Sequence, residues 1–215
     1  MKTFLKYLRS GLILTVAMLI ICGLAYPALM TGLGQAIFPN QANGSMITAA
    51  GERTEDPEKA VGSAIVGQDF SGDARYFQAR ISSVNYNTYT EEQLENGEYG
   101  GVGSGTFNYG ASNEDLKARV QEDVQKFIEA HPGVEEGDIP ADLLTASGSG
   151  LDPNISPEAA DIQIPAIAEA SGLSRKELRK IVEENTSGKI LGIFGHDRVN
   201  VLMCNLAIAE RIGEI

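Results

Sequence analysis

The sequence contains no tryptophan, only two cysteines and only two histidines among its 215 residues. Two cysteines cannot build a disulfide scaffold or a cysteine-rich zinc site. Basic residues are also scarce, with 17 Lys and Arg against 29 Asp and Glu and a formal net charge of −12. Binding to nucleic acid needs a surplus of cations to neutralise phosphates, so this composition argues against nucleic acid as a partner. The length predicts one ordinary domain with a short appendage.

The charges are distributed unevenly along the chain. Residues 1–40 hold Lys2, Lys6 and Arg9 and no acid, so residues 41–215 carry 14 basic and 29 acidic residues, a formal charge of −15. No charged residue occurs from Ser10 to Gly51, and the first half of this run is rich in Leu, Ile, Val, Ala and Met. The two parts of the chain are therefore expected to face different solvents.

The uncharged run predicts a single transmembrane helix over residues 11–34. Residues 12–33 would extend about 33 Å as a helix, enough to cross a hydrocarbon core of about 30 Å. Because all nearby cations precede the span, residues 1–10 are expected in the cytoplasm and residues 35–215 outside it. Pro27 lacks an amide hydrogen, so we expect a bend at Tyr26-Pro27.

Two other interpretations of the N-terminus remain open. A cleaved signal peptide would use the small-x-small site Gly23-Leu24-Ala25, although apolar residues continue well past Ala25. A lipoprotein anchor at Cys22 is disfavoured by the bulky Ile21 before it. A mature chain that begins at Tyr26 on N-terminal sequencing would contradict the membrane anchor.

Residues 35–215 are predicted to form one mixed, α+β domain with an irregular insertion. Glycines accumulate with Tyr, Asn and Ser over residues 84–112, which predicts a flexible loop and a candidate contact surface. After it, Ser112 and Asp115 predict the cap of an amphipathic helix. That helix should end at His131, where a basic side chain suits the helix dipole.

The C-terminal third predicts three more helices and a hairpin. Ser156 should cap a helix that Pro165 kinks and Gly172 ends. Ser174 and Glu177 predict a capping box for a helix that ends near residue 188. The β-branched runs 190–194 and 199–202 predict a hairpin, followed by a terminal helix over residues 205–212.

Signatures of catalysis are weak in this sequence. The cluster Ser147-Gly148-Ser149-Gly150 lacks the glycine spacing of a nucleophile elbow, and no phosphate loop is complete. The two histidines, His131 and His196, stand in no spaced metal-binding cluster. An anchored hydrolase that uses Ser149, His196 and Asp152 remains a minor alternative. The loop's small residues pack closely without any ligand, but its amides and the following helix N-terminus could also receive an anion.

Several motifs resemble a known family. They are Phe-Pro-Asn-Gln-Ala-Asn-Gly-Ser at 38–45, Val-Gly-Gln-Asp-Phe at 66–70, Leu-Thr-Ala-Ser-Gly-Ser-Gly-Leu-Asp-Pro-Asn-Ile-Ser-Pro at 144–157, Gln-Ile-Pro at 163–165 and Arg-Val-Asn-Val-Leu at 198–202. Over about residues 12–210 the chain resembles the C subunit of the bacterial Kdp potassium-transporting ATPase. It departs from the family pattern at 80–82 and 103–108, so the middle loop is expected to contact its partner differently.

The resemblance implies an accessory subunit in the bacterial inner membrane. Such a subunit catalyses nothing alone and assembles with a potassium-translocating subunit, a P-type ATPase subunit and a small single-span subunit. It binds no cofactor tightly. The family is described as a catalytic chaperone that raises the ATP affinity of the ATPase subunit, which implicates Ser147, Ser149, Asp152 and Gln163. The predicted topology conflicts with direct ATP contact, because it places these residues outside the cell.

The same resemblance and the predicted span give candidates for the partner interface. These are Gly32, Gly34, Gln41, Asn43, Gly44, Gln68, Phe77 and Arg80. We expect the acidic outer domain to cap the ion-uptake subunit, where its charge could modestly concentrate cations. A bitopic sensor or scaffold with an outer ligand-binding domain remains the alternative, and copurification with transporter subunits would separate the two.

Overall fold

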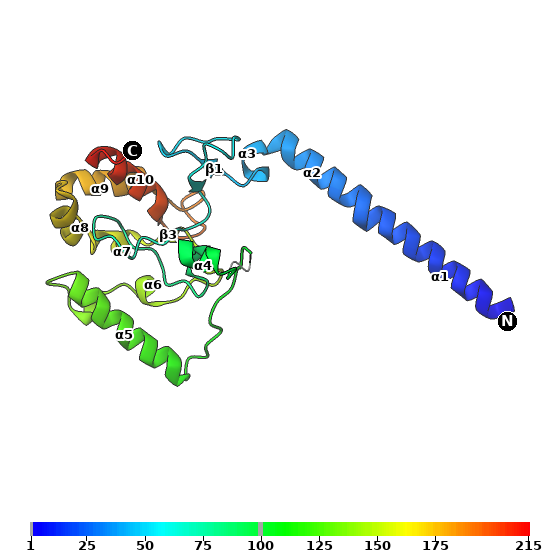
Figure 1. The fold of residues 1–215 in the computed structure, drawn as a ribbon, viewed down its shortest axis with the longest axis horizontal. Coiled ribbons are helices and arrows are strands. Elements are labelled where there is room, and N and C mark those ends of the chain that lie inside the picture. The colour runs from blue at the N-terminus through cyan, green and yellow to red at the C-terminus, as the bar shows by residue number, and fades with distance from the viewer. Residues whose placement is uncertain (1, 99–100) are drawn as a thin grey trace.

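The computed structural model describes residues 2–98 and 101–215. Tyr99 and Gly100, which belong to the predicted Gly-rich loop, lie outside the described residues. A long N-terminal helix extends away from a folded domain that contains the C-terminus (Figure 1). The predicted class, one apolar helix followed by a mixed helix and small-sheet domain, is confirmed.

The N-terminal rod consists of α1 (Lys2–Ile20), a π-helical turn η1 (Ile21–Ala25) and α2 (Tyr26–Ile37). Residues 3–37 form the one helix of the described chain that is long and apolar enough to cross a membrane. In the π turn the Tyr26 amide donates to the Ile21 carbonyl, five residues back. The expected bend at Tyr26-Pro27 is replaced by this local turn, and the helix continues through it as one rod (Figure 1).

A short connection joins the rod to the domain. It comprises α3 (Pro39–Ala42) and an antiparallel pair of two-residue strands, β1 (Met46–Ile47) and β2 (Gly62–Ser63). The Ser63 hydroxyl donates to the Gly44 carbonyl at 2.6 Å, which ties the connection together.

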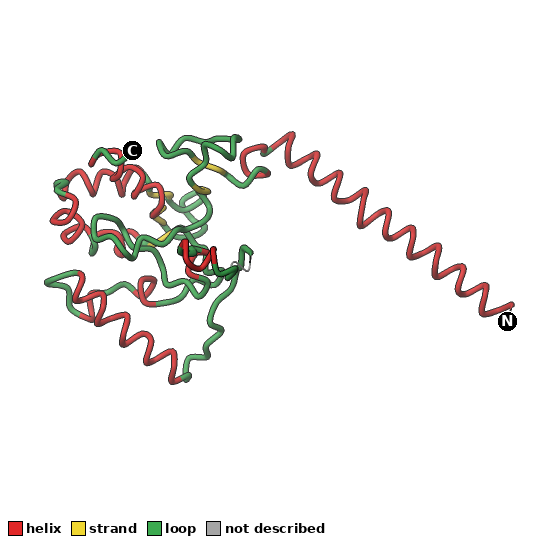
Figure 2. The backbone as a smooth tube through the Cα atoms, in the orientation of Figure 1, coloured by secondary structure: helices red, strands yellow, loops and turns green. Residues whose placement is uncertain are grey.

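The rest of the domain is mostly helix and loop, with few strand residues (Figure 2). Its second sheet has three antiparallel strands, with β5 (Arg198–Asn200) between β3 (Asn154–Ile155) and β4 (Thr186–Ser187). The remaining elements are η2 (Asn85–Asn87), α4 (Glu91–Glu95), α5 (Glu114–Ala130), η3 (Glu136–Asp138), α6 (Ala141–Leu144), α7 (Pro157–Asp161), α8 (Ile164–Ser171), α9 (Arg175–Glu184) and α10 (Val201–Ile212).

The core gathers around the last four helices. Apolar side chains from α7, α8, α9 and α10 pack with Val199 of β5, and Phe77 reaches in from a loop. Leu178, Ile181 and Ile208 are completely buried. Burial of such side chains contributes roughly 1.5–3 kcal/mol each, so this cluster is the main source of the domain's stability.

Most predicted helix ends in this region are confirmed. The Ser156 hydroxyl accepts from the Ala159 amide, Gly172 ends α8 with a φ of 77°, and Ser174 forms the predicted capping box with Glu177. Pro165 does more than kink one helix, because the chain breaks into α7 and α8 at residues 162–163. The helix after Ser174 ends at Glu184, earlier than expected.

Three local predictions were wrong. Asn113, not Ser112, caps α5, because its side chain accepts from two backbone amides of the first turn. Residues 190–194 do not form a strand of a hairpin with 199–202; β5 pairs instead with β4 and β3. The terminal helix begins at Val201 and not at 205, since Asn200 caps it by accepting from the Met203 amide.

Candidate functional site

An extended stretch of chain, residues 77–82, runs through the region where most motif residues meet. We call it the central segment. It has little secondary structure of its own, apart from a single parallel bridge between Ile81 and Ala146. Side chains from distant parts of the sequence satisfy the amides and carbonyls of Phe77 and Gln78, as a neighbouring strand would otherwise do.

The N-terminal end of the central segment is held by two buried amide side chains. Asn205 of α10 accepts from the Phe77 amide and donates to the Phe77 carbonyl, both at 2.9 Å. Gln163 accepts from the Gln78 amide at 2.7 Å and donates to the carbonyls of Gln78 and Ala159. Gln163 and Asn205 are almost fully buried, at 0% and 1% exposure. At this end, the two side chains make the backbone hydrogen bonds that a neighbouring strand would make in a sheet.

The C-terminal end is held by an ion pair and hydroxyl groups. Arg80 Nη1 lies 3.1 Å from Asp152 Oδ2, and both side chains are partly exposed. The Ser147 amide donates to the Ile81 carbonyl at 2.9 Å, and the Ser82 hydroxyl donates to the Gly150 carbonyl at 2.7 Å. This end is more polar and more open than the first.

The loop at 147–152 is organised around one buried hydroxyl. Ser147 is 1% exposed, and its Oγ accepts from the amides of Gly150 and Asp152 at 3.0 and 3.4 Å. Ser149 is exposed, with its Oγ 3.2 Å from that of Ser147. Asp152 Oδ1 accepts from the backbone and the side chain of Asn154, so both carboxylate oxygens have partners.

The four residues implicated in nucleotide affinity therefore fall into two groups. Ser147, Ser149 and Asp152 lie together in one loop, whereas Gln163 binds the other end of the central segment. All four make hydrogen bonds within the chain, and Ser149 is the exposed member of the set. Their immediate chemistry is to hold the central segment, and their role toward a nucleotide stays a prediction.

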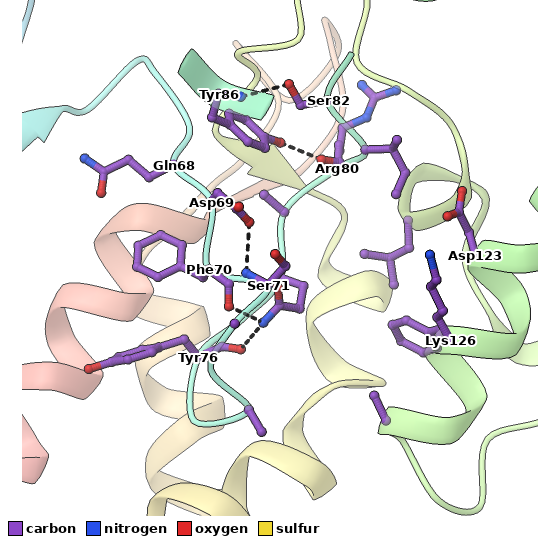
Figure 3. A pocket seen from close by; sticks show the side chains of 18 of the residues that line it. Gln68, Asp69, Phe70, Ser71, Tyr76, Arg80, Ser82, Tyr86, Asp123 and Lys126 are labelled. Atoms are coloured by element: carbon purple, nitrogen blue, oxygen red, sulfur yellow. Dashed lines mark hydrogen bonds between the residues drawn. The ribbon is translucent and has the colours of Figure 1, made fainter. Parts of the chain in front are cut away.

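A cavity of about 790 Å³ opens beside the central segment. Figure 3 shows Asp123 and Lys126 of α5 on one side of it and Phe70 and Tyr76 on the opposite side. Besides Asp123 and Lys126, the acid Asp69 and the cation Arg80 line the cavity. Its lining balances positive and negative charges, so it has no strong preference for an anion.

Tyr86 was missed by the sequence analysis, although it organises this region. Its hydroxyl donates to the Arg80 carbonyl at 2.6 Å, and its amide donates to Ser82 Oγ at 3.0 Å (Figure 3). Burial raises the pKa of Tyr86 to about 12, so the phenol stays a donor at neutral pH. The sequence signal for this packing is Gly67: a Cβ there would lie 2.5 Å from the Tyr86 ring, so the ring needs a glycine beside it.

A second hollow of about 490 Å³ is lined by the 147–152 loop. Ile65 and Val66 line it together with Ser147, Ser149 and Asp152. The loop that was considered as an anion site thus borders an open, partly apolar depression. The described residues that line it include no cation, which makes it a poor site for a polyphosphate.

His131 takes the predicted position at the C-terminal end of α5. Its ring stacks on Phe127 with centroids 3.9 Å apart, and its Nδ1 lies 2.9 Å from the Phe127 carbonyl oxygen. Burial lowers its pKa, although the carbonyl contact opposes that shift. The net shift favours the neutral ring, because desolvation outweighs the hydrogen bond to the carbonyl.

The interface candidates at the helix end lie in mixed surroundings. Gly32 is open, since a Cβ added there would have no described atom within 4 Å, whereas a Cβ at Gly34 would lie 3.7 Å from Ala42 of α3. Gln41 is exposed, and Asn43 accepts from Gln35 Nε2 at 2.8 Å. Gly44 has a φ of 84°, which an L side chain rarely adopts.

The other interface candidates mostly make contacts inside the chain. Phe77 is buried in the core, and Arg80 binds Asp152. Gln68 donates to the Val61 carbonyl at 2.9 Å and lies against Gly62, where a Cβ would be 2.3 Å from its amide nitrogen. Whether any of these residues also touches a partner stays a prediction.

The described part of the Gly-rich loop is attached to its own domain. The Gly105 amide donates to the Ser149 carbonyl at 2.8 Å, and the Ser104 hydroxyl donates to the same oxygen at 3.1 Å. Asn87 exchanges two hydrogen bonds with the backbone of Gly103. Part of the Gly-rich loop, which was predicted as a candidate surface for contact with a partner, therefore contacts the 147–152 loop of its own domain.

Among the described residues, no three His, Cys, Asp or Glu side chains converge as a metal site would require. Burial raises the pKa of the Cys204 thiol to about 12, so it is a poor nucleophile at neutral pH. The Asp152 carboxylate of the minor hydrolase alternative is committed to Arg80 and Asn154. The region is built to hold a polar loop in a fixed shape.

Comparisons with known proteins identify the family. The family model described as "K+-transporting ATPase, c chain" matches residues 8–210. The potassium-transporting ATPase KdpC subunit of Clostridioides difficile is 53% identical over 98% of this chain and 100% of its own length. Those of Clostridium kluyveri and Bacillus cereus are 51% and 39% identical, over 99% and 92% of this chain and 98% and 92% of their own lengths. The chain therefore belongs to the KdpC family of potassium-transporting ATPase subunits.

Proposed function

We propose that this KdpC subunit is an accessory, non-catalytic part of the Kdp complex that stabilises the assembly of the ion-conducting and ATP-hydrolysing subunits. The observation that supports it best is the join between rod and domain. There Gly32 has an open face on the apolar helix, and the exposed Gln41 and the backbone turn at Gly44 follow shortly after that helix ends at residue 37. Small residues on a membrane helix permit close approach by a partner helix.

The assembly role is tested by a pair of glycine substitutions with equal backbone cost. Gly44 and Gly133 both have positive φ, 84° and 92°, and at either position an added Cβ would have no described atom within 4 Å. Gly44→Ala and Gly133→Ala should therefore be strained similarly, by roughly 1 kcal/mol. We expect Gly44→Ala to release the subunit during detergent purification of the complex, while Gly133→Ala stays bound. Equal retention of the two variants would contradict the assembly role of this turn.

We further propose that the domain lies outside the cytoplasm, with the N-terminus inside. The charge pattern supports it, because three cations precede the span and the domain is strongly acidic. Cys22 lies in the rod and Cys204 is buried, so an introduced thiol can be read with little background. An impermeant maleimide should label Glu129→Cys in intact cells and should label Thr3→Cys only after lysis. The reverse pattern would overturn the orientation.

An effect on the ATP affinity of the ATPase subunit would, in this orientation, be transmitted through assembly. The internal hydrogen bonds of Ser147, Asp152 and Gln163 favour such an indirect effect. Ser149→Ala removes the exposed hydroxyl and should leave the Kd for ATP of the purified complex unchanged. Weaker ATP binding by an intact Ser149→Ala complex would support direct contact instead.

The acidic domain is also proposed to sit at the ion entrance, where its charge modestly concentrates cations. Screening over about 8 Å at physiological salt limits this effect to low ionic strength. Changing several exposed acids of α5 to amides should slow potassium uptake at low salt and not at high salt. Unchanged uptake at low salt would remove this part of the proposal.

A further inference from the structure

The connection between β4 and β5 carries an unusual exposed apolar loop, residues 189–195. Four of its side chains point into solvent: Ile190, Leu191, Ile193 and Phe194 are 64%, 84%, 75% and 64% exposed. Single exposed apolar residues are common on proteins, but a contiguous group of four is not. Such a group marks a surface that is covered when the protein works.

The apolar loop has a defined shape. Ile190 and Phe194 exchange backbone hydrogen bonds of 2.9 and 3.0 Å, which close the turn. Gly192 and Gly195 have φ values of 73° and 87°, so glycine is suited to both corners. The loop therefore presents its apolar side chains outward on a closed backbone turn, and its exposure does not arise from an unpaired end of chain.

The apolar loop arises near the end of the domain that joins the rod. Asn200, at the end of β5, donates to the Ala64 carbonyl at 2.7 Å, and the Ala64 amide donates to the Ser45 carbonyl at 3.0 Å. Ser45 follows the rod directly after α3, and β1 lies beside that junction in Figure 1. Val61 and Ile65, in the segment next to Ala64, are also exposed apolar residues.

We propose that the apolar loop inserts into the lipid bilayer at the face from which the chain's own helix emerges. The base of the apolar loop carries two exposed cations, Lys189 and Arg198, and one exposed acid, Asp197, so it is net positive in a domain that is otherwise strongly acidic. Apolar side chains flanked by cations suit an interface of acyl chains and phosphate headgroups. The covalent link to a membrane helix keeps the loop at a high effective concentration near that surface.

A lipid partner is favoured over a protein partner by the chain itself. Every molecule of this subunit carries the membrane helix, so the bilayer is always within reach of this end of the domain. A second attachment would fix the tilt of the domain relative to the membrane. The proposal does not depend on the assembly role, because it applies equally to the subunit alone.

The absence of tryptophan permits a direct test with a single introduced reporter. Ile193→Trp places the indole in the apolar loop, and Val102→Trp places it in the Gly-rich loop at nearly equal exposure, 75% against 78%. The full chain is reconstituted into vesicles of phosphatidylethanolamine and phosphatidylglycerol, with and without brominated acyl chains. We expect brominated lipid to reduce the Ile193→Trp emission about twofold and to leave Val102→Trp nearly unchanged, as for a side chain at the acyl boundary.

Phe194→Trp serves as a second reporter if the first substitution disturbs the loop. Equal emission with and without brominated lipid, for both Ile193→Trp and Phe194→Trp, would overturn the proposal. So would shielding from aqueous iodide that appears only when the other Kdp subunits are present, because that result would assign the loop to a protein interface. Quenching by brominated lipid that persists when Gly44→Ala has released the subunit from the complex would support both the loop insertion and its independence from assembly.

Discussion

The two ends of the central segment are held in place by different chemistry. At Phe77 and Gln78, buried neutral amides of Asn205 and Gln163 satisfy the backbone. At Arg80 to Ser82, the side chains of the segment itself make the contacts: Arg80 forms a partly exposed ion pair with Asp152, and the Ser82 hydroxyl donates to the Gly150 carbonyl. A buried group that loses its partner costs more than an exposed one, because water cannot replace the bond. The first end should therefore govern stability, and the second can adjust to a partner.

The largest expected effect is at the buried end. Gln163→Ala would leave the amide and carbonyl of Gln78 without their present partners and create a small cavity. We expect a loss of about 3 kcal/mol in the free energy of unfolding. Urea denaturation of the full chain in detergent, followed by circular dichroism, measures it. Gln125→Ala on the exposed face of α5 is the control, and similar losses for both would break the comparison.

The next effect tests how tightly the exposed end is packed. A Cβ at Gly150 would lie 2.7 Å from Val84 and 2.8 Å from the Gly105 carbonyl, at a φ of 69°, whereas one at Gly148 would meet no described atom within 4 Å. We expect Gly150→Ala to destabilise the chain by about 2 kcal/mol, through strain and the displaced loop. Gly148→Ala should have little effect. Limited proteolysis at 84–112 should quicken only for Gly150→Ala; unchanged cleavage would mean the loop contact is dispensable.

A smaller effect is expected for the ion pair itself. Arg80 and Asp152 retain 24% and 31% exposure of their side chains, so solvent screens part of their attraction. Arg80→Ala should cost about 1 kcal/mol, and a double-mutant cycle with Asp152→Ala isolates the pair. Lys126→Ala breaks a much more exposed pair with Glu122 and should cost less. A coupling energy near zero would show that the hydroxyl contacts alone hold this end.

The smallest effect is a pH dependence at His131, outside the central segment. Its pKa is lowered in the folded state, so the unfolded chain binds the proton more readily. The stability due to the neutral ring is present above the unfolded pKa of about 6.5 and is lost as the pH falls through the folded value. His131→Phe keeps a stacked ring without titration. The difference in Tm between wild type and this variant should grow in the variant's favour from pH 7.5 to 5; a constant difference would contradict the burial effect.

The span and most helix ends could be predicted because their signals are local. An uncharged apolar run, a serine before a proline and a glycine after a helix act within a few residues. Ser156, Gly172 and Ser174 therefore appear where the sequence predicts them. The choice between Ser112 and Asn113 as the cap could not be predicted, because either side chain can supply the accepting oxygen. The helix begins at Glu114, which makes Asn113 the N-cap residue.

The architecture of the site could not be predicted from local pattern. Asn205, Gln163 and Asp152, which hold the central segment, lie 72 to 128 positions away from their partners along the chain, and no periodicity encodes such pairings. The strands are two or three residues long, too short to show alternation. The β-branched run at 190–194 had the composition of a strand, yet the polar pair Thr186–Ser187 is the true neighbour of β5.

The π turn at Ile21–Ala25 has a consequence for any search for partner-facing positions in the rod. One additional residue in a helical turn rotates everything after it by about 100° relative to an uninterrupted helix. Side chains of α1 and α2 that share a heptad position on paper thus point toward different neighbours. A tryptophan scan of the rod should show two separate azimuthal phases, one up to Ile20 and one from Tyr26.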